Sequence, residues 1–427
     1  MFKTQTFAHQ TLALKRRQTD IRPAIAPVKV RRGTPDYQRI SLALFLAGFA
    51  TFSLLYTVQP LLPLFAQHFH VTPAASSLAL SLSTGALACA IMLAAMLSET
   101  AGRRGLMFIS MSAAAIMNIV AGLAPNWTTL LIARALEGFV LGGVPAVAMA
   151  YLAEEIDGGS LGLAMGRYVG GTAFGGMMGR VGAGLFAEAF GWRAALCIMG
   201  ALGVAAAIAF VLLLPASRYF DRKRGFDLRF HVRAWGGHLT DRGLPLLFAI
   251  GFLVMGAFVT VYNYAGFRLM AAPYHFSQTV IGLIFTVYVF GIVASSTAGS
   301  AADKLGRGRV LPMGLGTALI GALLTLSAAV PVIILGIILL TVGFFISHAV
   351  ASGWVGRLAA GSKGHASSLY LLAYYLGSSV AGTAGGWFWS HGGWPGVISF
   401  AGVCLVLALF CGLGVGRISR PQRAEPR

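Results

Sequence analysis

The stretch GSAADKLGRGRVL, at Gly299–Leu311, carries four charged side chains in a sequence that is only 11% charged. A second stretch, AAMLSETAGRRGLM at Ala94–Met107, repeats its order of an acid, a glycine and an arginine. The corresponding residues are Glu99, Gly102 and Arg103 in the earlier stretch and Asp303, Gly306 and Arg307 in the later one. A pattern that recurs within one chain predicts two related halves, each with this charged turn at the same place.

The sequence around these turns is strongly apolar. Hydrophobic residues make up 57% of the chain, and the mean hydropathy is +0.77. Apolar runs of about 20 residues recur along the chain, and a run of that length can cross a bilayer as a helix. We therefore predict an all-α polytopic membrane protein with twelve transmembrane helices, over residues 40–66, 74–97, 105–124, 127–152, 162–189, 193–214, 244–270, 278–301, 308–328, 331–353, 365–389 and 394–416.

The charged turn follows the second helix of each predicted half, so the helices divide into two six-helix bundles. The pair Gly171 and Gly377 falls at a similar separation and supports this division. We expect a basic cytoplasmic tail at 1–37, an N-terminal bundle at 38–215, a central cytoplasmic loop at 216–242, a C-terminal bundle at 243–416 and a second cytoplasmic tail at 417–427. Parallel repeats of this kind are typical of transporters whose halves rock about a site between them.

The formal net charge of +19 reflects membrane topology rather than nucleic-acid binding. Most of the 32 lysines and arginines lie in the two tails and in the loops after even-numbered helices, whereas the opposite face carries only Arg193 and Arg268. This asymmetry predicts that both termini are cytoplasmic. The four cysteines lie within apolar runs without the spacing of metal ligands, so we expect neither a metal nor a cofactor.

Three motifs resemble those of the major facilitator superfamily. They are the acid-x-x-Gly-Arg turn of both halves, RALEG at Arg134–Gly138, and GTAFGG at Gly171–Gly176, which is similar to the glycine motif of drug:proton antiporters. The longer stretch LYLLAYYLGSSVAGTAGGWFW, which begins at Leu369, is similar to the bacterial inner-membrane efflux branch. The resemblance implies a fold of two six-helix bundles in the bacterial inner membrane and a small-molecule substrate exchanged for protons.

The charged turns have a predicted role in such a fold. A carboxylate beside the N-terminus of a helix is favoured by the helix dipole and by a nearby arginine. We expect these clusters to latch the two halves in one conformation and to release them in the other. The simpler alternative is that the arginines only anchor short loops. The predicted latch residues are Glu99, Arg103, Asp303 and Arg307.

Arg134 and Glu137 lie three residues apart in the fourth predicted helix, so they can pair on one helix face. Glu137 is the carboxylate that we place near the middle of the membrane, where a carboxyl group is neutral or charged depending on its neighbours. This position favours Glu137 as a proton carrier controlled by Arg134. A static neutralising pair is the alternative.

The fifth predicted helix carries a stripe of glycines that ends at Arg180. Glycines at a spacing of four let helices approach closely, and we expect this stripe to pack against a helix of the other half. Arg180 would then face an interface or a cavity, where it could meet an anionic partner, and Glu188 would contact Arg180 or Arg193. The stripe consists of Gly171, Gly175, Gly176 and Gly179.

The resemblance implies that the first, fourth, seventh and tenth helices line the substrate cavity. Here they offer aromatic rings with few charges, which suit amphipathic organic molecules better than highly polar sugars. Together with Arg180, the predicted substrate and proton pathway comprises Tyr56, Gln59, Arg134, Glu137, Asn263, Tyr264 and His348.

The sequence thus predicts a secondary active transporter that works in the lipid bilayer as a monomer and exports small organic compounds in exchange for protons. The direction of transport is not encoded in these motifs, so a proton-coupled importer of a small metabolite is the alternative in the same fold. Other classes are disfavoured. A membrane enzyme would need clustered His, Asp or Cys, ATP-driven transport would need a phosphate-binding loop, and a membrane solute sensor would need a soluble output domain.

Overall fold

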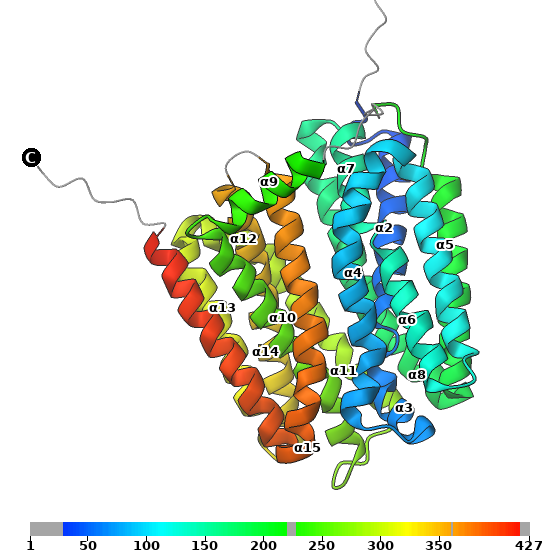
Figure 1. Cartoon of the computed structure of the whole chain (residues 1–427), viewed down its shortest axis with the longest axis vertical. Coiled ribbons are helices and arrows are strands. Elements are labelled where there is room, and N and C mark those ends of the chain that lie inside the picture. Colours follow the sequence, from blue (N-terminus) through cyan, green and yellow to red (C-terminus); the bar gives the residue numbers. More distant parts are fainter. Residues whose placement is uncertain (1–28, 220–227, 360–361, 419–427) are drawn as a thin grey trace, which may run out of the picture.

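The computed structural model describes residues 29–219, 228–359 and 362–418, except for the side chains at 95–101, 146, 228 and 230. This part of the chain is almost entirely helical (Figure 1). The elements before the central loop are α2 (Pro35–Tyr56), η1 (Gln59–Leu61), α3 (Leu62–Phe69), α4 (Pro73–Ala101), α5 (Arg103–Gly122), α6 (Trp127–Leu141), α7 (Pro145–Glu155) and α8 (Gly158–Leu213). Helix α9 (Leu228–Leu239) lies in the loop. The elements after it are α10 (Leu244–Met270), α11 (Gln278–Ile284), η2 (Phe285–Val287), α12 (Tyr288–Leu305), α13 (Arg307–Leu324), α14 (Val330–Leu358) and α15 (Lys363–Ile418).

The described helices account for all twelve predicted spans. Eight helical segments are long and apolar enough to cross a membrane. Two of them, α8 and α15, have 56 residues each and are broken by a non-helical glycine, Gly191 in α8 and Gly393 in α15, so each crosses twice. Helices α6 with α7, and helix α13, provide the remaining two crossings. The all-α, twelve-helix prediction is therefore confirmed.

Two predicted spans are bent where the sequence places prolines. The first span passes from α2 through η1 to α3 at Pro60 and Pro63, and the fourth breaks between α6 and α7 before Pro145. Proline has no N–H to donate and clashes with the preceding turn, which bends or breaks a helix. The continuous helices expected at 40–66 and 127–152 are therefore each made of shorter pieces.

The glycines of the two charged turns, Gly102 and Gly306, have nearly the same backbone conformation. Gly102 has φ 81° and ψ 138°, and Gly306 has φ 89° and ψ 136°. A positive φ strains any residue with a Cβ atom, so glycine is favoured at both positions. Each of these glycines ends one helix and begins the next, which shows the internal repeat in three dimensions.

The glycine stripe of α8 packs against α2 of its own half, so the expected contact with the other half is wrong. A Cβ atom added at Gly175 would lie 2.2 Å from the carbonyl oxygen of Phe49 on α2. Gly171 and Gly179, one turn to either side, approach α2 backbone in the same way. The first and fifth helices of the bundle are thus in direct backbone contact, which only residues without a side chain permit.

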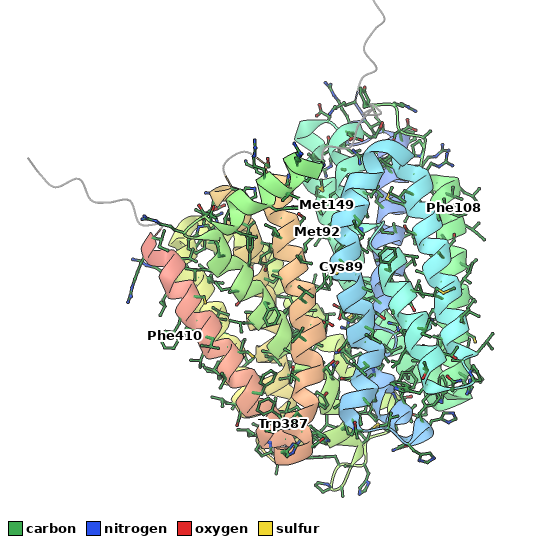
Figure 2. All side chains as sticks on the ribbon, viewed as in Figure 1. Cys89, Met92, Phe108, Met149, Trp387 and Phe410 are labelled. Carbon is green, nitrogen blue, oxygen red and sulfur yellow. The ribbon has the colours of Figure 1, made fainter. Side chains whose placement is uncertain are left out.

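Figure 1 shows α2–α8 and α10–α15 as two bundles side by side, with α4 and α15 facing each other between them. We call the end of the molecule where α9 and the charged turns lie the basic end, and the end where α3 lies the opposite end. Phe410, on the flank of the C-terminal bundle (Figure 2), is 66% exposed. Apolar flanks of this kind are expected where helices face lipid.

Candidate functional site

Arg134 and Glu137 form an ion pair inside the N-terminal half. Both side chains are fully buried on α6. The guanidinium also donates to the carbonyl oxygens of Leu55 (2.7 Å) at the end of α2 and of Ala79 (3.0 Å) on α4, and to Oδ1 of Asn118 (3.3 Å) on α5, so Arg134 joins four helices of one bundle. The second carboxylate oxygen of Glu137, Oε1, has no hydrogen-bond partner among the described residues. The pair therefore leaves one buried oxygen with room for a proton.

A second buried network crosses between the two halves. Arg180 on α8 donates from Nε to Oε1 of Gln59 (2.6 Å), and Gln59 donates from Nε2 to Oδ1 of Asn263 on α10 (2.7 Å). Each of these residues is at most 2% exposed. Arg180 also donates to the carbonyl oxygen of Gly176 (2.5 Å), one turn earlier on its own helix. Polar side chains from both halves thus meet in the buried interface between the two bundles.

Aromatic rings of both halves surround the guanidinium of Arg180. Its central carbon lies 3.9 Å from the ring centroid of Tyr56, 5.0 Å from that of Phe285 and 4.9 Å from that of Tyr288. A cation over an aromatic face is attracted by the ring quadrupole, more strongly where water is excluded. Tyr56 belongs to the N-terminal half and the other two rings to the C-terminal half, so this cage is complete only while the halves are together.

Tyr264 and His348 form their hydrogen bonds outside this network. Tyr264 donates from its hydroxyl to the carbonyl oxygen of Gly382 on α15 (3.1 Å). His348 is hydrogen-bonded through Nδ1 to the hydroxyl of Tyr370 (3.0 Å), and its ring stacks at 6.1 Å from that of Phe344. His348 is thus held by Tyr370 and Phe344 within the C-terminal half.

The predicted pathway residues therefore fall into separate groups. Those that meet at the interface are Tyr56, Gln59, Arg180 and Asn263. Phe285 and Tyr288 were not predicted, because the eighth helix is not among the cavity-lining helices that the resemblance implies. The available signal was an aromatic pair three residues apart, on one face of an apolar span.

The charged turns at the basic end form ion pairs within their own halves. Arg103 donates from Nε to Glu154 at the end of α7 (2.7 Å). Asp303 accepts hydrogen bonds from Arg307 (2.8 Å) and from Arg357 near the end of α14 (3.2 Å). In both halves, the turn is therefore tied to the fourth helix of its own bundle.

The predicted latch residues are only partly seen in this arrangement. The side chain of Glu99 lies outside the described part of the structure. Glu154 and Arg357 were not predicted, although a charge near the basic end of the fourth helix in each half was an available signal. In the described residues, the turns pair within a bundle rather than across the two.

The halves are held together at the opposite end. Gln278 on α11 donates to the carbonyl oxygen of Pro60 (2.6 Å). A Cβ atom added at Gly184 would lie 2.9 Å from the Cα atom of Gly282, so α8 and α11 touch backbone to backbone. This close approach leaves no room for a substrate to pass between these two helices.

Glu188 adds to this closure. Its carboxylate accepts a hydrogen bond from the backbone N–H of Thr279 (2.6 Å), near the start of α11. The expected contact with Arg180 or Arg193 is therefore wrong. The free N–H groups at a helix start attract a carboxylate, and this attraction acts here across the two halves.

The described residues hold no group of three or more His, Cys, Asp or Glu placed to bind a metal ion. Two repeated bundles of membrane-spanning helices around a buried polar interface are the architecture of a membrane transporter rather than of an enzyme. The chain belongs to the major facilitator superfamily, whose sequence profile matches residues 44–270 and 247–427.

Two bacterial relatives match the chain over nearly their whole length. The chain is 45% identical over 392 residues to the inner membrane transport protein YnfM of Escherichia coli K12, covering 91% of this chain and 93% of that one. It is 44% identical over 381 residues to YybF of Bacillus subtilis 168, described as an uncharacterised MFS-type transporter, covering 89% and 94%. These names support transport across a membrane.

Solved structures share the fold. A bacterial homologue of the human lysosomal transporter Spinster, in an inward-facing and unoccupied conformation, superposes with a TM-score of 0.73 at 15% identity and covers 92% of this chain and 100% of that one. The nucleoside transporter NupG superposes with a TM-score of 0.72 at 12% identity, covering 89% and 100%. At these identities the likeness concerns the fold alone.

Proposed function

We propose that this protein exports small organic compounds across the bacterial inner membrane in exchange for protons, by alternating access and as a monomer. The moving bodies are the bundles at 38–215 and 243–416, joined by the loop at 216–242. The basic end and the tails at 1–37 and 417–427 face the cytoplasm, as the charge asymmetry favours. Efflux is supported by the glycine motif at Gly171–Gly176, which resembles that of drug:proton antiporters.

One observation carries this proposal: in the part of the chain that the structure describes, the hydrogen bonds between the halves gather towards one end. The hydrogen bonds between the halves of the described chain lie between the opposite end and the middle, where Ser379 Oγ donates to the carbonyl oxygen of Ser81 (2.7 Å). At the basic end, the described ion pairs of the charged turns, Arg103 with Glu154 and Asp303 with Arg307 and Arg357, each lie within one bundle. Closure at one end is what alternating access requires of one of its two states.

The two buried networks are adjacent, which gives proton coupling a physical route. Arg134 holds the carbonyl oxygen of Leu55, and the next residue, Tyr56, lies over the guanidinium of Arg180. A movement of α2 therefore reaches both the interface and the pair of Arg134 with Glu137. If that pair is pulled apart, a proton on Glu137 avoids the cost of an unpaired buried charge.

The test is transport in inside-out membrane vesicles with an acidic lumen. A proton-coupled exporter accumulates its substrate in the lumen while protons leave, whereas a proton-coupled importer discharges preloaded substrate. We expect accumulation of at least one member of a panel of small organic compounds, abolished by a protonophore. If no compound moves in response to the gradient, proton coupling is wrong, and discharge instead of accumulation would reverse the direction.

A further inference from the structure

The charge of Arg180 is not neutralised by a carboxylate in the described residues, unlike that of Arg134, the other arginine buried in the membrane interior. In the described part of the chain, Arg134 is paired with Glu137, whereas no carboxylate forms an ion pair with Arg180. Arg180 is 1% exposed. An arginine in the membrane interior costs about 2.5–3.5 kcal/mol even on insertion scales, so an unbalanced one is a candidate functional group.

The arginines near the opposite end are held differently. Arg193 donates to the carbonyl oxygens of Gly122 and Ala124 (3.3 and 2.7 Å), where α5 ends. Arg268 donates to those of Thr325 and Ser327, where α13 ends. Free carbonyls at a helix C-terminus carry partial negative charge, which compensates a cation. Arg180 donates instead to the carbonyl oxygen of Gly176, in the middle of a helix, and to the neutral side-chain amide of Gln59.

The hydrogen-bond directions at this site leave the NH₂ group of Asn263 without an acceptor. Arginine only donates, so the oxygen of Gln59 must face Arg180 and its NH₂ group must face Asn263. The oxygen of Asn263 is then the acceptor, and its NH₂ group is turned away. That nitrogen is buried and has no hydrogen-bond partner among the described residues. A cation and an unpaired N–H donor at one site both call for an acceptor that carries negative charge.

The rings beside the site favour an apolar body on that ligand. From Tyr288, ring contacts continue to Phe258 at 5.8 Å, to Phe344 at 3.8 Å and to His348 at 6.1 Å. His348 lines a small pocket with Tyr374 and residues of α10. An apolar or aromatic group can lie along such rings, while its charged end stays at the guanidinium.

We propose that Arg180 and Asn263 form the head-group site for an organic monocarboxylate with an aromatic or apolar body. This inference rests on the proposed transport function and names its substrate class. The carboxylate pairs with the planar guanidinium of Arg180. To do so it takes the place of Gln59 at Arg180, which weakens the polar bridge between the halves. Loss of the bond from Gln59 lets the Asn263 amide turn, so that its Nδ2 donates to the carboxylate. Binding of the anion therefore favours release of the opposite end.

The first test uses purified wild-type protein in detergent and four probes at about 10 mM: benzoate, benzamide, benzylamine and acetate. The first three carry a negative, a neutral and a positive group on the same ring, and acetate is a carboxylate without the ring. Thermal unfolding reports binding independently of transport, because a ligand that binds the folded state raises Tm. We expect benzoate to raise Tm by about 2 °C and to bind about 10–100-fold more tightly than benzamide, with acetate in between or weaker.

Variants assign this binding to the site. Arg180→Gln should lose the benzoate-induced shift in Tm. Arg180→Lys keeps the positive charge but not the planar pair of N–H donors, so it should bind benzoate about tenfold more weakly. Arg268→Gln is the matched control, because it removes an arginine held by carbonyls and aromatic rings elsewhere, and it should keep the full shift. If Arg180→Gln does not fold, the comparison of benzoate with benzamide and benzylamine on the wild type still decides.

The outcomes separate this inference from the proposed transport. An unchanged Tm with benzoate, or a larger shift with benzylamine or benzamide, overturns the anion site whatever the vesicles show. A benzoate shift that survives Arg180→Gln overturns the assignment to Arg180. Selective binding of benzoate together with a failure of all gradient-driven transport would support the anion site and reject the transport proposal.

Discussion

Arg134 and Arg180 are both buried, but the two charges are held in different ways. Arg134 has a carboxylate on its own helix and carbonyls from two neighbouring helices. Arg180 has amide, carbonyl and ring partners, and it bridges to the other half through Gln59. The first arrangement suits a group that must carry or exchange a proton inside one bundle. The second suits a group that waits for a ligand between bundles.

Glu137→Gln tests the proton-carrier role. Glutamine keeps the size and the oxygen that accepts from Arg134 but cannot titrate, so accumulation driven by a pH gradient should be abolished while substrate exchange without a gradient continues. Both are measured with purified protein in liposomes. Asp36→Asn, which removes an exposed ion pair with Arg218, is the control and should transport normally. Normal concentration of substrate by Glu137→Gln would move the coupling to another group.

Arg134→Ala separates pairing from titration. It leaves Glu137 buried without its cation and removes ties to α2 and α4, a loss of about 3–5 kcal/mol for a broken buried pair. We therefore expect this variant to lose both exchange and thermal stability, whereas Glu137→Gln keeps exchange and an oxygen that accepts from Arg134.

The partner of Arg134 could be predicted from the sequence and the partners of Arg180 could not. Glu137 lies three residues away on the same helix, and that spacing alone brings the two side chains together. Gln59 and Asn263 reach Arg180 from helices that are distant in the sequence. Their meeting depends on how the bundles pack, which no local pattern encodes.

At the scale of helices, the glycine stripe of α8 likewise has one feature that the sequence predicts and one that it does not. The spacing of four predicted a close helix contact, but not that α2 supplies it. On α2 the contact is made by the backbone at Phe49 and by Gly48, where an added Cβ atom would lie 3.0 Å from the carbonyl oxygen of Tyr168 on α8. A single glycine does not distinguish α2 from the other helices as the partner. The hydropathy pattern likewise placed the spans well but missed the bend before Pro145.

Gly175→Ala should destabilise the contact of α2 with α8. The added Cβ atom would lie 2.2 Å from a backbone oxygen, so the helices must separate, and a fall in Tm of several degrees is expected. Gly170→Ala is the matched control, because nothing lies within 4 Å of its added Cβ atom and alanine favours a helix more than glycine does. Equal Tm values for the two variants would contradict this packing.

Asp303→Asn tests the charged turn as a conformational element. Asp303 is 56% exposed at its side chain, so the loss of its pairs with Arg307 and Arg357 should cost less than about 1 kcal/mol and leave membrane insertion intact. We expect it to shift the balance between the two end states. Cysteine probes at both ends, in a background without the four native cysteines, report that balance. Lys304→Gln in the same turn is the control, and identical labelling of Asp303→Asn and wild type would leave the turn only an anchoring role.

At the scale of the whole molecule, the orientation in the membrane can be tested directly. A reporter inserted after Thr240, at the basic end, should read cytoplasmic, and one after Pro125, between α5 and α6, should read external. The excess of Lys and Arg at the basic end is the physical reason. The opposite readings would invert the protein and place the closed end of this conformation towards the cytoplasm.

The last prediction concerns the closure between the two halves. Closure at the opposite end requires α8 and α11 to touch at Gly184 and Gly282, and an added Cβ atom at Gly282 would lie 3.1 Å from the Cα atom of Gly184. Gly282→Val puts a branched side chain there, so the closed arrangement is penalised while each bundle stays intact. We expect Cys substituted at Thr279 to become several-fold more reactive to a membrane-impermeant thiol reagent from the opposite end. Gly299→Val, in the same predicted span but with nothing within 4 Å of an added Cβ atom, should leave that reactivity unchanged. Equal reactivity in the two variants would mean that the glycine contact does not hold the end closed, and the interface would then depend on the polar bridge from Gln59 to Asn263.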